Sequence, residues 1–237
     1  LCQASSWRGQ NASSNPVMIN AHRPTSCKLT LRDLTVVVCT CNRKDLFIRA
    51  LDSIFACSGL SPSVIVVDDS LCGMKYAREV IESDIKYAPY SILVIDTIGS
   101  IGSQKSRNLG LTLTRTVLIG FLDDDDYYFP ASLESLLPSL NTGNSRVAYG
   151  NALRPVSPST DISDNECITI GFPFYPSDLY TRNPIPFSAA IAFTEDLIRI
   201  GGFDIELCSH QDWDLWIRLS EAYNCLLYTS DAADDTP

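Results

Sequence analysis

The sequence has too few basic residues to balance its acidic ones: 18 Lys and Arg stand against 28 Asp and Glu, a formal net charge of -10. Nucleic-acid binding needs Lys and Arg to displace counterions, so nucleic acid is a poor candidate partner. The sequence also lacks an apolar run near the roughly 18–20 residues of a membrane span, and a charged-then-apolar signal peptide. We therefore expect a soluble, cytoplasmic protein.

Cysteine spacing of the zinc-binding kind is missing as well. The chain has nine cysteines but no C-x-x-C pair, which argues against a zinc site. We interpret the cysteines as reduced thiols of a cytosolic protein. Apolar residues make up 45 % of the 237 residues, enough for the core of one α/β domain.

Composition divides the chain into three parts. Residues 1–33 are rich in Ser, Asn, Pro and Arg without a sustained apolar period, which predicts a flexible leader. Residues 34–224 form the predicted folded domain. Residues 225–237, CLLYTSDAADDTP, resemble the read-through translation of a sequencing adapter. We therefore expect a non-native tail, and a domain that is incomplete at its C-terminus.

Short β-branched runs alternate with helical periodicity in the first half of the domain. The alternation predicts right-handed crossovers and a single α/β (Rossmann-like) domain, with a mainly parallel central sheet flanked by helices. Ligands then bind at the carboxyl ends of the strands. The expected strands cover 34–39, 63–70 and 91–96 and a fourth starts at 116; the expected helices begin near 46 and cover 74–83 and 103–114.

The second half is less regular. We expect helices over 130–140, 194–200 and 212–223, and strands over 146–150 and 187–193. Residues 154–186 are rich in Pro, Ser and aromatics, and we predict a long loop region there. Loops of this length are usually functional or mobile.

The sharpest local signal is the run FLDDDD, in which a strand delivers four aspartates, residues 123–126, into one turn with no basic residue beside them. Clustered carboxylates raise each other's pKa unless a cation joins them, and hard oxygen ligands suit Mg²⁺ or Mn²⁺. Asp123 and Asp125 form a D-x-D pair that could hold such an ion with substrate phosphates. A solvated acidic turn is the alternative. An EF-hand fails because Tyr128 stands where its loop requires Gly.

Two further segments lie beside other predicted strands. The run VVDDS places Asp68 and Asp69 at a strand end, where either could accept a hydrogen bond from a uracil or thymine ring or a ribose hydroxyl. Asp is also common at such junctions without a function. The run GSQKSRNLG places Lys105 and Arg107 near a helix start, where they could meet phosphate oxygens; a solvated basic face is the alternative.

The last signal is GGFDIELCSHQDWDLWIRL. Asp212 opens an amphipathic helix that Trp and Leu residues anchor. A carboxylate is favoured at a helix N-terminus, so Asp212 is either a cap or a general base aimed at an acceptor hydroxyl.

These blocks, in this order on one α/β pattern, resemble family 2 glycosyltransferases of the GT-A fold. The resemblance rests on VVVCTCNR, VVDDS, GSQKSRNLG, FLDDDD and GGFDIELCSHQDWDLWIRL, and covers roughly residues 34–223. Three features depart from the family pattern: Cys41 in the opening turn, Gln211 before the expected base, and the absence of a C-terminal segment that often closes over the donor.

The resemblance implies an inverting, metal-dependent enzyme that moves a sugar from a UDP- or TDP-sugar to a hydroxyl of a saccharide or lipid-linked acceptor, as in polysaccharide biosynthesis. Asp212 would be the catalytic base, and Asp123 and Asp125 would hold Mn²⁺ or Mg²⁺. The missing C-terminal segment could add peripheral association with the inner face of the membrane. The resemblance and these motifs together assign nucleotide-sugar binding to Thr40, Asn42, Arg43, Asp68, Asp69, Lys105, Arg107, Asp123 and Asp124.

Three other functions compete with this one. A sugar nucleotidyltransferase needs a Gly-rich, basic loop after its first strand, where this chain has CTCNRKD. A phosphatase of the D-x-D-x-T/V kind needs Thr or Val where Tyr127 stands. An inactive nucleotide- or carbohydrate-binding relative is the alternative without catalysis; the presence of both Asp125 and Asp212 argues against it.

Overall fold

The computed structural model describes residues 28–56, 61–141, 145–155, 167–171 and 173–223. Residues 1–27 of the predicted leader and the predicted tail lie outside this part. Residues 28–33, which the sequence places in the leader, pack against the domain. Leu29 and Leu31 are buried, and the Leu29 N–H donates to Asn141 Oδ1 at 2.7 Å.

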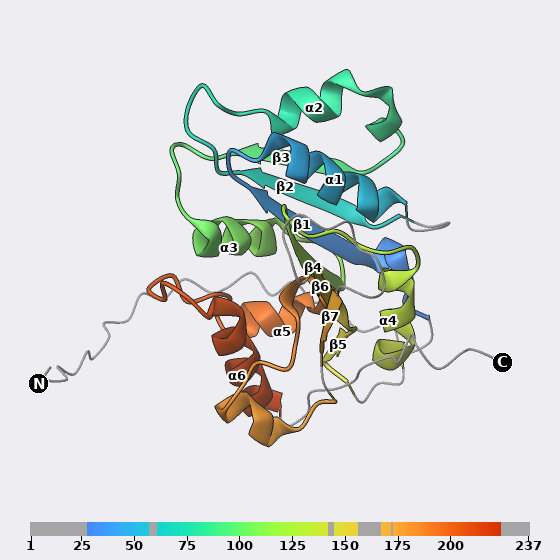
Figure 1. Ribbon diagram of the computed structural model, residues 1–237, viewed down its shortest axis with the longest axis vertical. Coiled ribbons are helices and arrows are strands. Elements are labelled where there is room, and N and C mark those ends of the chain that lie inside the picture. Colours follow the sequence, from blue (N-terminus) through green and yellow to red (C-terminus); the bar gives the residue numbers. More distant parts are fainter. Residues whose placement is uncertain (1–27, 57–60, 142–144, 156–166, 172, 224–237) are drawn as a thin grey trace, which may run out of the picture.

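A six-stranded sheet forms the centre of the domain, in the order β3-β2-β1-β4-β8-β5 (Figure 1). The first four strands in the chain pair in parallel, whereas β8 pairs antiparallel with both β4 and β5. This confirms the predicted mainly parallel sheet. The strands are β1 Leu34–Thr40, β2 Ser63–Asp68, β3 Ile92–Asp96, β4 Leu118–Asp123, β5 Val147–Tyr149 and β8 Ala190–Phe193.

Helices cover both faces of the sheet, because β1 and β2 alternate apolar side chains between two cores. One core packs α1, α2 and α4, and the other packs α3, α5 and α6. The helices are α1 Lys44–Phe55, α2 Ala77–Ser83, α3 Ser103–Leu113, α4 Ser132–Asn141, α5 Thr194–Arg199 and α6 Gln211–Tyr223; short 3₁₀ helices are η1 Leu31–Asp33, η2 Ile85–Tyr87, η3 Pro176–Tyr180 and η4 Phe187–Ala189.

The structure corrects three predicted boundaries. Helix α2 starts three residues later than expected, because the N–H groups of Tyr76 and Ala77 donate to Asp68 instead of continuing a helix from residue 74. Strand β8 starts only after η4, whereas a strand was expected from residue 187. The predicted loop over 154–186 contains η3, and β7 Cys167–Ile170 pairs there with β6 Ala152–Pro155 in an antiparallel ribbon.

Helix α3 lies unusually close to β1. A Cβ atom added to Gly110 would lie 2.3 Å from a methyl group of Val37, so only glycine permits this approach. The contact fixes how α3 presents its side chains beside the end of β1. Within the described ranges, no helix combines the length and apolarity needed to cross a bilayer.

Candidate active site at the carboxyl ends of β1 and β4

The strand order of the sheet has a switch point between β1 and β4. From β1 the chain builds outward through β2 to β3, and α3 then returns it to the other side of β1 as β4. Open α/β sheets bind ligands in the crevice at such a switch point, beyond the carboxyl ends of the strands. Here those ends carry Thr40 and Asp123, with Cys39 and Asp123 in register.

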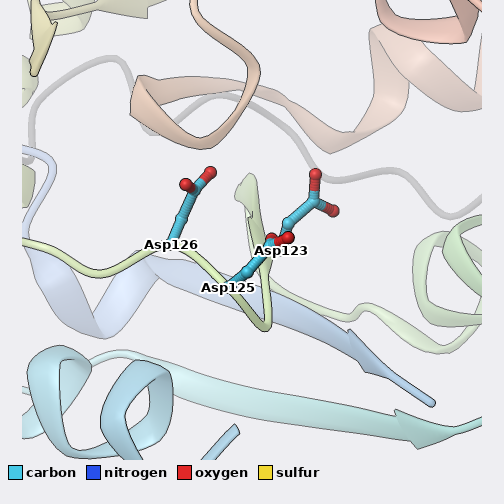
Figure 2. Close-up of side chains that lie close together, drawn as sticks. All are labelled: Asp123, Asp125 and Asp126. Atoms are coloured by element: carbon cyan, nitrogen blue, oxygen red, sulfur yellow. The ribbon is translucent and has the colours of Figure 1, made fainter. Parts of the chain in front are cut away.

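The acidic turn after β4 separates its carboxylates into two groups. The Asp126 N–H closes the turn on the Asp123 carbonyl at 3.0 Å. Asp123, Asp125 and Asp126 present carboxylate oxygens that all lie within 4.8 Å of one another (Figure 2). Asp124 turns inward and is fully buried. The turn therefore offers three oxygen ligands on its outer side. Asp123 and Asp125 were expected as metal ligands from the sequence, whereas Asp126 was not.

Asp124 fastens the turn to the end of β1. The Arg43 N–H donates to Tyr76 Oη at 3.0 Å, the Tyr76 and Thr40 hydroxyls bond to each other, and Thr40 Oγ1 donates to Asp124 Oδ2 at 2.7 Å. Burial raises the pKa of Asp124, and the hydrogen bond from Thr40 and the charge of Arg43 oppose this rise. Asp124 and Thr40, both expected to contact the nucleotide sugar, are thus buried parts of the scaffold beneath the turn.

The acidic turn has basic partners, contrary to the reading of its local sequence. Arg43 pairs with buried Asp124 and places Nη1 2.8 Å from Asp125 Oδ2. Arg107 places Nη2 2.6 Å from Asp123 Oδ1. The fold brings both guanidinium groups in from other elements, so two of the three outward carboxylates are already paired with a cation.

Asp68 and Asp69 lie at the predicted edge of the sheet, but their oxygens are engaged by the protein. Asp68 accepts from the backbone N–H groups of Ser70, Tyr76 and Ala77 at 3.0 Å each. Burial tends to raise the pKa of Asp68, but these hydrogen bonds outweigh burial and the pKa is lowered. Asp68 therefore holds the loop between β2 and α2.

Asp69 holds the loop between β3 and α3 in the same way. It accepts from the N–H groups of Ile101 at 2.8 Å and Gly102 at 2.9 Å, and from the hydroxyls of Thr97 and Ser100. Burial tends to raise the pKa of Asp69, but the hydrogen bonds from this loop outweigh burial and the pKa is lowered. The carboxylate therefore stays ionised. Both aspartates shape the loops that border the site.

Two other residues that were predicted to contact the nucleotide sugar, Asn42 and Lys105, are exposed. Asn42 adopts a left-handed backbone conformation with φ 58° and donates its N–H to Ser70 Oγ at 2.9 Å, so its side chain leaves the opening turn toward solvent. Lys105 is exposed on the first turn of α3. Asn42 lies in the loop after β1 and Lys105 at the start of α3, which follows β3, so both lie near the carboxyl ends of the parallel strands.

Arg107 links the acidic turn to the start of α6. Beside its ion pair with Asp123, its Nη1 donates to Gln211 Oε1 at 3.2 Å. The guanidinium lies over the ring of Phe187, 4.4 Å from its centroid, and the residue is only 8 % exposed. Arg107 thus connects Asp123 of the acidic turn to Gln211, the residue before Asp212 at the start of α6.

Asp212 is half-buried in the first turn of α6, as predicted. Its Oδ2 accepts a hydrogen bond from Asn183 Nδ2 at 2.7 Å. Ser188, in the same segment, donates to Asp126 Oδ2 at 2.5 Å. Loss of hydration raises the pKa of Asp126 despite this bond, and the charges of Asp123 and Asp125 add to the rise. Neither residue was predicted as part of the site, because Asn183 lies in the predicted loop and Ser188 lies in a run expected to be a strand.

The family model described as "Glycosyl transferase family 2" matches residues 35–198, which is more than half of the chain. The chain belongs to glycosyl transferase family 2. The match contains the acidic turn and Arg107 but ends before α6. Asp212 lies on α6 and is therefore outside the matched residues.

Curated relatives carry glycosyltransferase names. An uncharacterized glycosyltransferase of Haemophilus influenzae is 27 % identical over 194 residues, which are 78 % of this chain and 61 % of the relative. The pre-mycofactocin glycosyltransferase of Mycobacterium tuberculosis is 33 % identical over 214 residues, 83 % of this chain and 41 % of the relative. The chain thus spans less than two thirds of the length of these two relatives.

Solved structures share the fold. TarS of S. aureus superposes with a TM-score of 0.66 at 21 % identity, covering 84 % of this chain and 35 % of TarS. The mannosyltransferase PcManGT from Pyrobaculum calidifontis, solved with GDP-Man and Mn²⁺, gives a TM-score of 0.63 at 17 % identity over 84 % of this chain and 55 % of PcManGT. This glycosyl transferase family 2 chain therefore has the GT-A fold of these enzymes.

Proposed function

We propose that this chain carries the catalytic site of an inverting glycosyltransferase, which moves a sugar from a UDP- or TDP-sugar to a hydroxyl of a saccharide or lipid-linked acceptor. One observation carries the proposal. Arg107 touches Asp123 of the acidic turn through one nitrogen and Gln211, beside Asp212, through another. A candidate phosphate- and metal-binding turn and a candidate base are thus held together at the switch point of the sheet.

The outward carboxylates fit a divalent cation. Asp123, Asp125 and Asp126 offer three hard oxygen ligands close together, as Mn²⁺ and Mg²⁺ prefer. We propose Asp123 and Asp125 as ligands, with Asp126 as a third. When bound, such an ion would neutralise charge on the departing diphosphate. That PcManGT is solved with Mn²⁺, and TarS with UDP, supports a nucleotide-sugar donor and a metal here.

The protein's own groups then have separate tasks. Arg43 and Arg107 would contact diphosphate oxygens once the cation takes over the carboxylates with which they pair. Exposed Asn42 and Lys105 are proposed donor contacts at the rim. Asp212 would take the proton from the acceptor hydroxyl as its oxygen bonds to the anomeric carbon, while the bond to the diphosphate breaks on the opposite face. Displacement from the opposite face inverts the anomeric centre.

The ion pair between Arg43 and Asp125 should weaken the affinity for a metal ion. Replacing Arg43 by Gln should tighten Mn²⁺ binding roughly two- to fivefold, because a guanidinium that competes for Asp125 is removed, and an exposed ion pair is worth about 0.2–1 kcal/mol. Lys44→Gln is the matched control, since it removes the same charge one residue on, where the side chain faces Glu79. Titration calorimetry with Mn²⁺ measures both. Equal affinities of the two variants would contradict the competition.

The rival functions predict different products. A glycosyltransferase incubated with UDP-glucose or UDP-N-acetylglucosamine, Mn²⁺ and p-nitrophenyl glycosides should release UDP and form a glycosylated acceptor. A sugar nucleotidyltransferase would instead consume UTP and a sugar phosphate and release pyrophosphate, and an inactive relative would bind UDP without turnover. Chromatography of the nucleotide products separates the three. Pyrophosphate release, or binding without any transfer across the panel, would overturn the proposal.

The wider setting of the reaction is also a proposal. The succinoglycan biosynthesis protein ExoO of Rhizobium meliloti matches half of this chain at 29 % identity, which supports a role in polysaccharide biosynthesis. We propose that the enzyme acts in the cytoplasm, with peripheral association at the inner face of the membrane if its acceptor is lipid-linked.

A further inference from the structure

We infer that Asn183 is the positioning residue for the carboxylate of Asp212, an inference that rests on the proposed role of Asp212 as the base. The amide nitrogen of Asn183 lies 2.7 Å from Asp212 Oδ2, although 29 positions separate the two residues. Within the described part of the chain, no other side chain or N–H group donates to that carboxylate. The direction of the Asp212 side chain therefore depends on one hydrogen bond.

The orientation of the Asn183 amide is itself determined. The Ile185 N–H donates to Asn183 Oδ1 at 3.2 Å, and a backbone N–H can only meet the oxygen end of an amide. The NH₂ end must then point to Asp212. An ionised carboxylate only accepts hydrogen bonds, so a donor is the partner that this geometry requires.

The backbone around Asn183 is anchored against α6. Pro184 and Ile185 are buried. Four residues before Asn183, the Leu179 carbonyl accepts a hydrogen bond of 2.7 Å from Trp213 Nε1, in the residue that follows Asp212. The donor and the base therefore belong to two segments that a second hydrogen bond joins close to the contact. Such support is what holds a catalytic group to the sub-ångström precision that transfer requires.

The hydrogen bond leaves the other oxygen of Asp212 for the acceptor. Asn183 engages Oδ2, and Oδ1 has no hydrogen-bond donor among the described residues, so it is the oxygen that would receive the proton. Five residues further on, Ser188 reaches the acidic turn through Asp126. One segment thus sets both the direction of the base and the outer wall of the proposed metal site.

A purely structural role for Asn183 makes a different prediction, because its two ends act separately. Asn183→Asp keeps an oxygen for the Ile185 N–H but replaces the donor to Asp212 by a repelling carboxylate oxygen. Asn183→Ala removes both contacts. If Asn183 only closes the turn to Ile185, the Asp variant retains activity and the Ala variant loses stability.

The test measures kcat, donor KM and the melting temperature for both variants, with UDP-glucose or UDP-N-acetylglucosamine and p-nitrophenyl glycosides. We expect Asn183→Asp and Asn183→Ala to lower kcat about 10- to 100-fold, the size of effect that a misplaced catalytic group produces. Donor KM should change less than about twofold, because the acidic turn is untouched. Thr181→Ala is the control in the same segment, since within the described ranges its exposed hydroxyl bonds only to the Asp178 carbonyl, and it should keep the wild-type kcat.

A double variant separates this inference from the proposed function. If Asn183 acts through Asp212, Asn183→Ala should not slow Asp212→Asn any further. Full activity of Asp212→Asn would overturn the base assignment itself. A slow Asp212→Asn together with full activity of Asn183→Asp, or with independent effects of the two changes, would overturn the positioning role alone. Crystal structures provide a test without turnover: an Asp212 carboxylate in its original orientation in Asn183→Ala would contradict the inference.

Discussion

Replacing Asp212 by Asn should slow sugar transfer by about 10²–10⁴-fold, the usual contribution of a general base. The change keeps the shape of the side chain, and an oxygen remains to accept from Asn183. Asn is also favoured near a helix N-terminus, as Asp is, so α6 should keep its start. The free energy of unfolding and the affinity for UDP with Mn²⁺ should therefore change little, whereas the proton acceptor is lost.

Asp214 provides the matched control for this experiment. It lies on the same helix two residues on, but it accepts two hydrogen bonds from Arg218, at 2.6 and 2.9 Å. Arg218 in turn donates to the carbonyls of Ile200 and Gly202. Asp214→Asn should therefore lower the melting temperature and leave kcat nearly unchanged. Near-full transfer by Asp212→Asn would place the base elsewhere, with exposed Glu206 as the next candidate.

The central strands were predictable because the residues of each strand are enough to indicate a buried β-strand. β1 and β2 are short β-branched runs buried on both faces, and no competing helical period runs through them. The polar residues that follow each strand then had to meet at one edge of the sheet. For this reason Thr40, Asp69 and Asp123 reach the same region, as the alternation of strands and helices predicted.

The charge balance of the site was not predictable from local sequence. Asp124 has no basic neighbour in the sequence, yet its partner Arg43 stands 81 positions earlier, and Gln211 meets Arg107 across 104 positions. Such pairs depend on which strand ends are adjacent, and adjacency is a property of the sheet order. The acidic turn therefore reads as unpaired until β1 and β4 are placed side by side.

The segment from η3 to β8 was the least predictable. It has no period of two or of 3.6, because it is fixed by single hydrogen bonds such as that from Trp213 to the Leu179 carbonyl. Asn183 lies in the predicted loop and Ser188 in the expected strand over 187–193, and neither carries a motif that marks a function. Their contacts with Asp212 and Asp126 exist only once α6 and the acidic turn have been brought together.

Binding of UDP should require a divalent cation, and Asp125→Ala should abolish the stabilisation by UDP and Mn²⁺. A ligand at 100 times its Kd stabilises the folded state by about 2.7 kcal/mol, which corresponds to roughly 5–10 °C in melting temperature for a domain of this size. We expect a shift of that order with UDP and Mn²⁺, and almost none with UDP and a chelator. Asp123, Asp125 and Asp126 repel a diphosphate unless a cation lies between them.

Asp125 is the informative position within the turn. Its side chain is 51 % exposed and, among the residues that the structure describes, its carboxylate pairs only with exposed Arg43. Its removal should therefore cost little stability, unlike removal of buried Asp124. Asp96→Ala is the control, because Asp96 ends β3 at the same edge of the sheet but pairs with Arg78. The control should keep the full UDP and Mn²⁺ shift while Asp125→Ala loses it. An equal UDP shift in chelator and in Mn²⁺ would remove the metal from the mechanism and leave donor binding to Arg43 and Arg107.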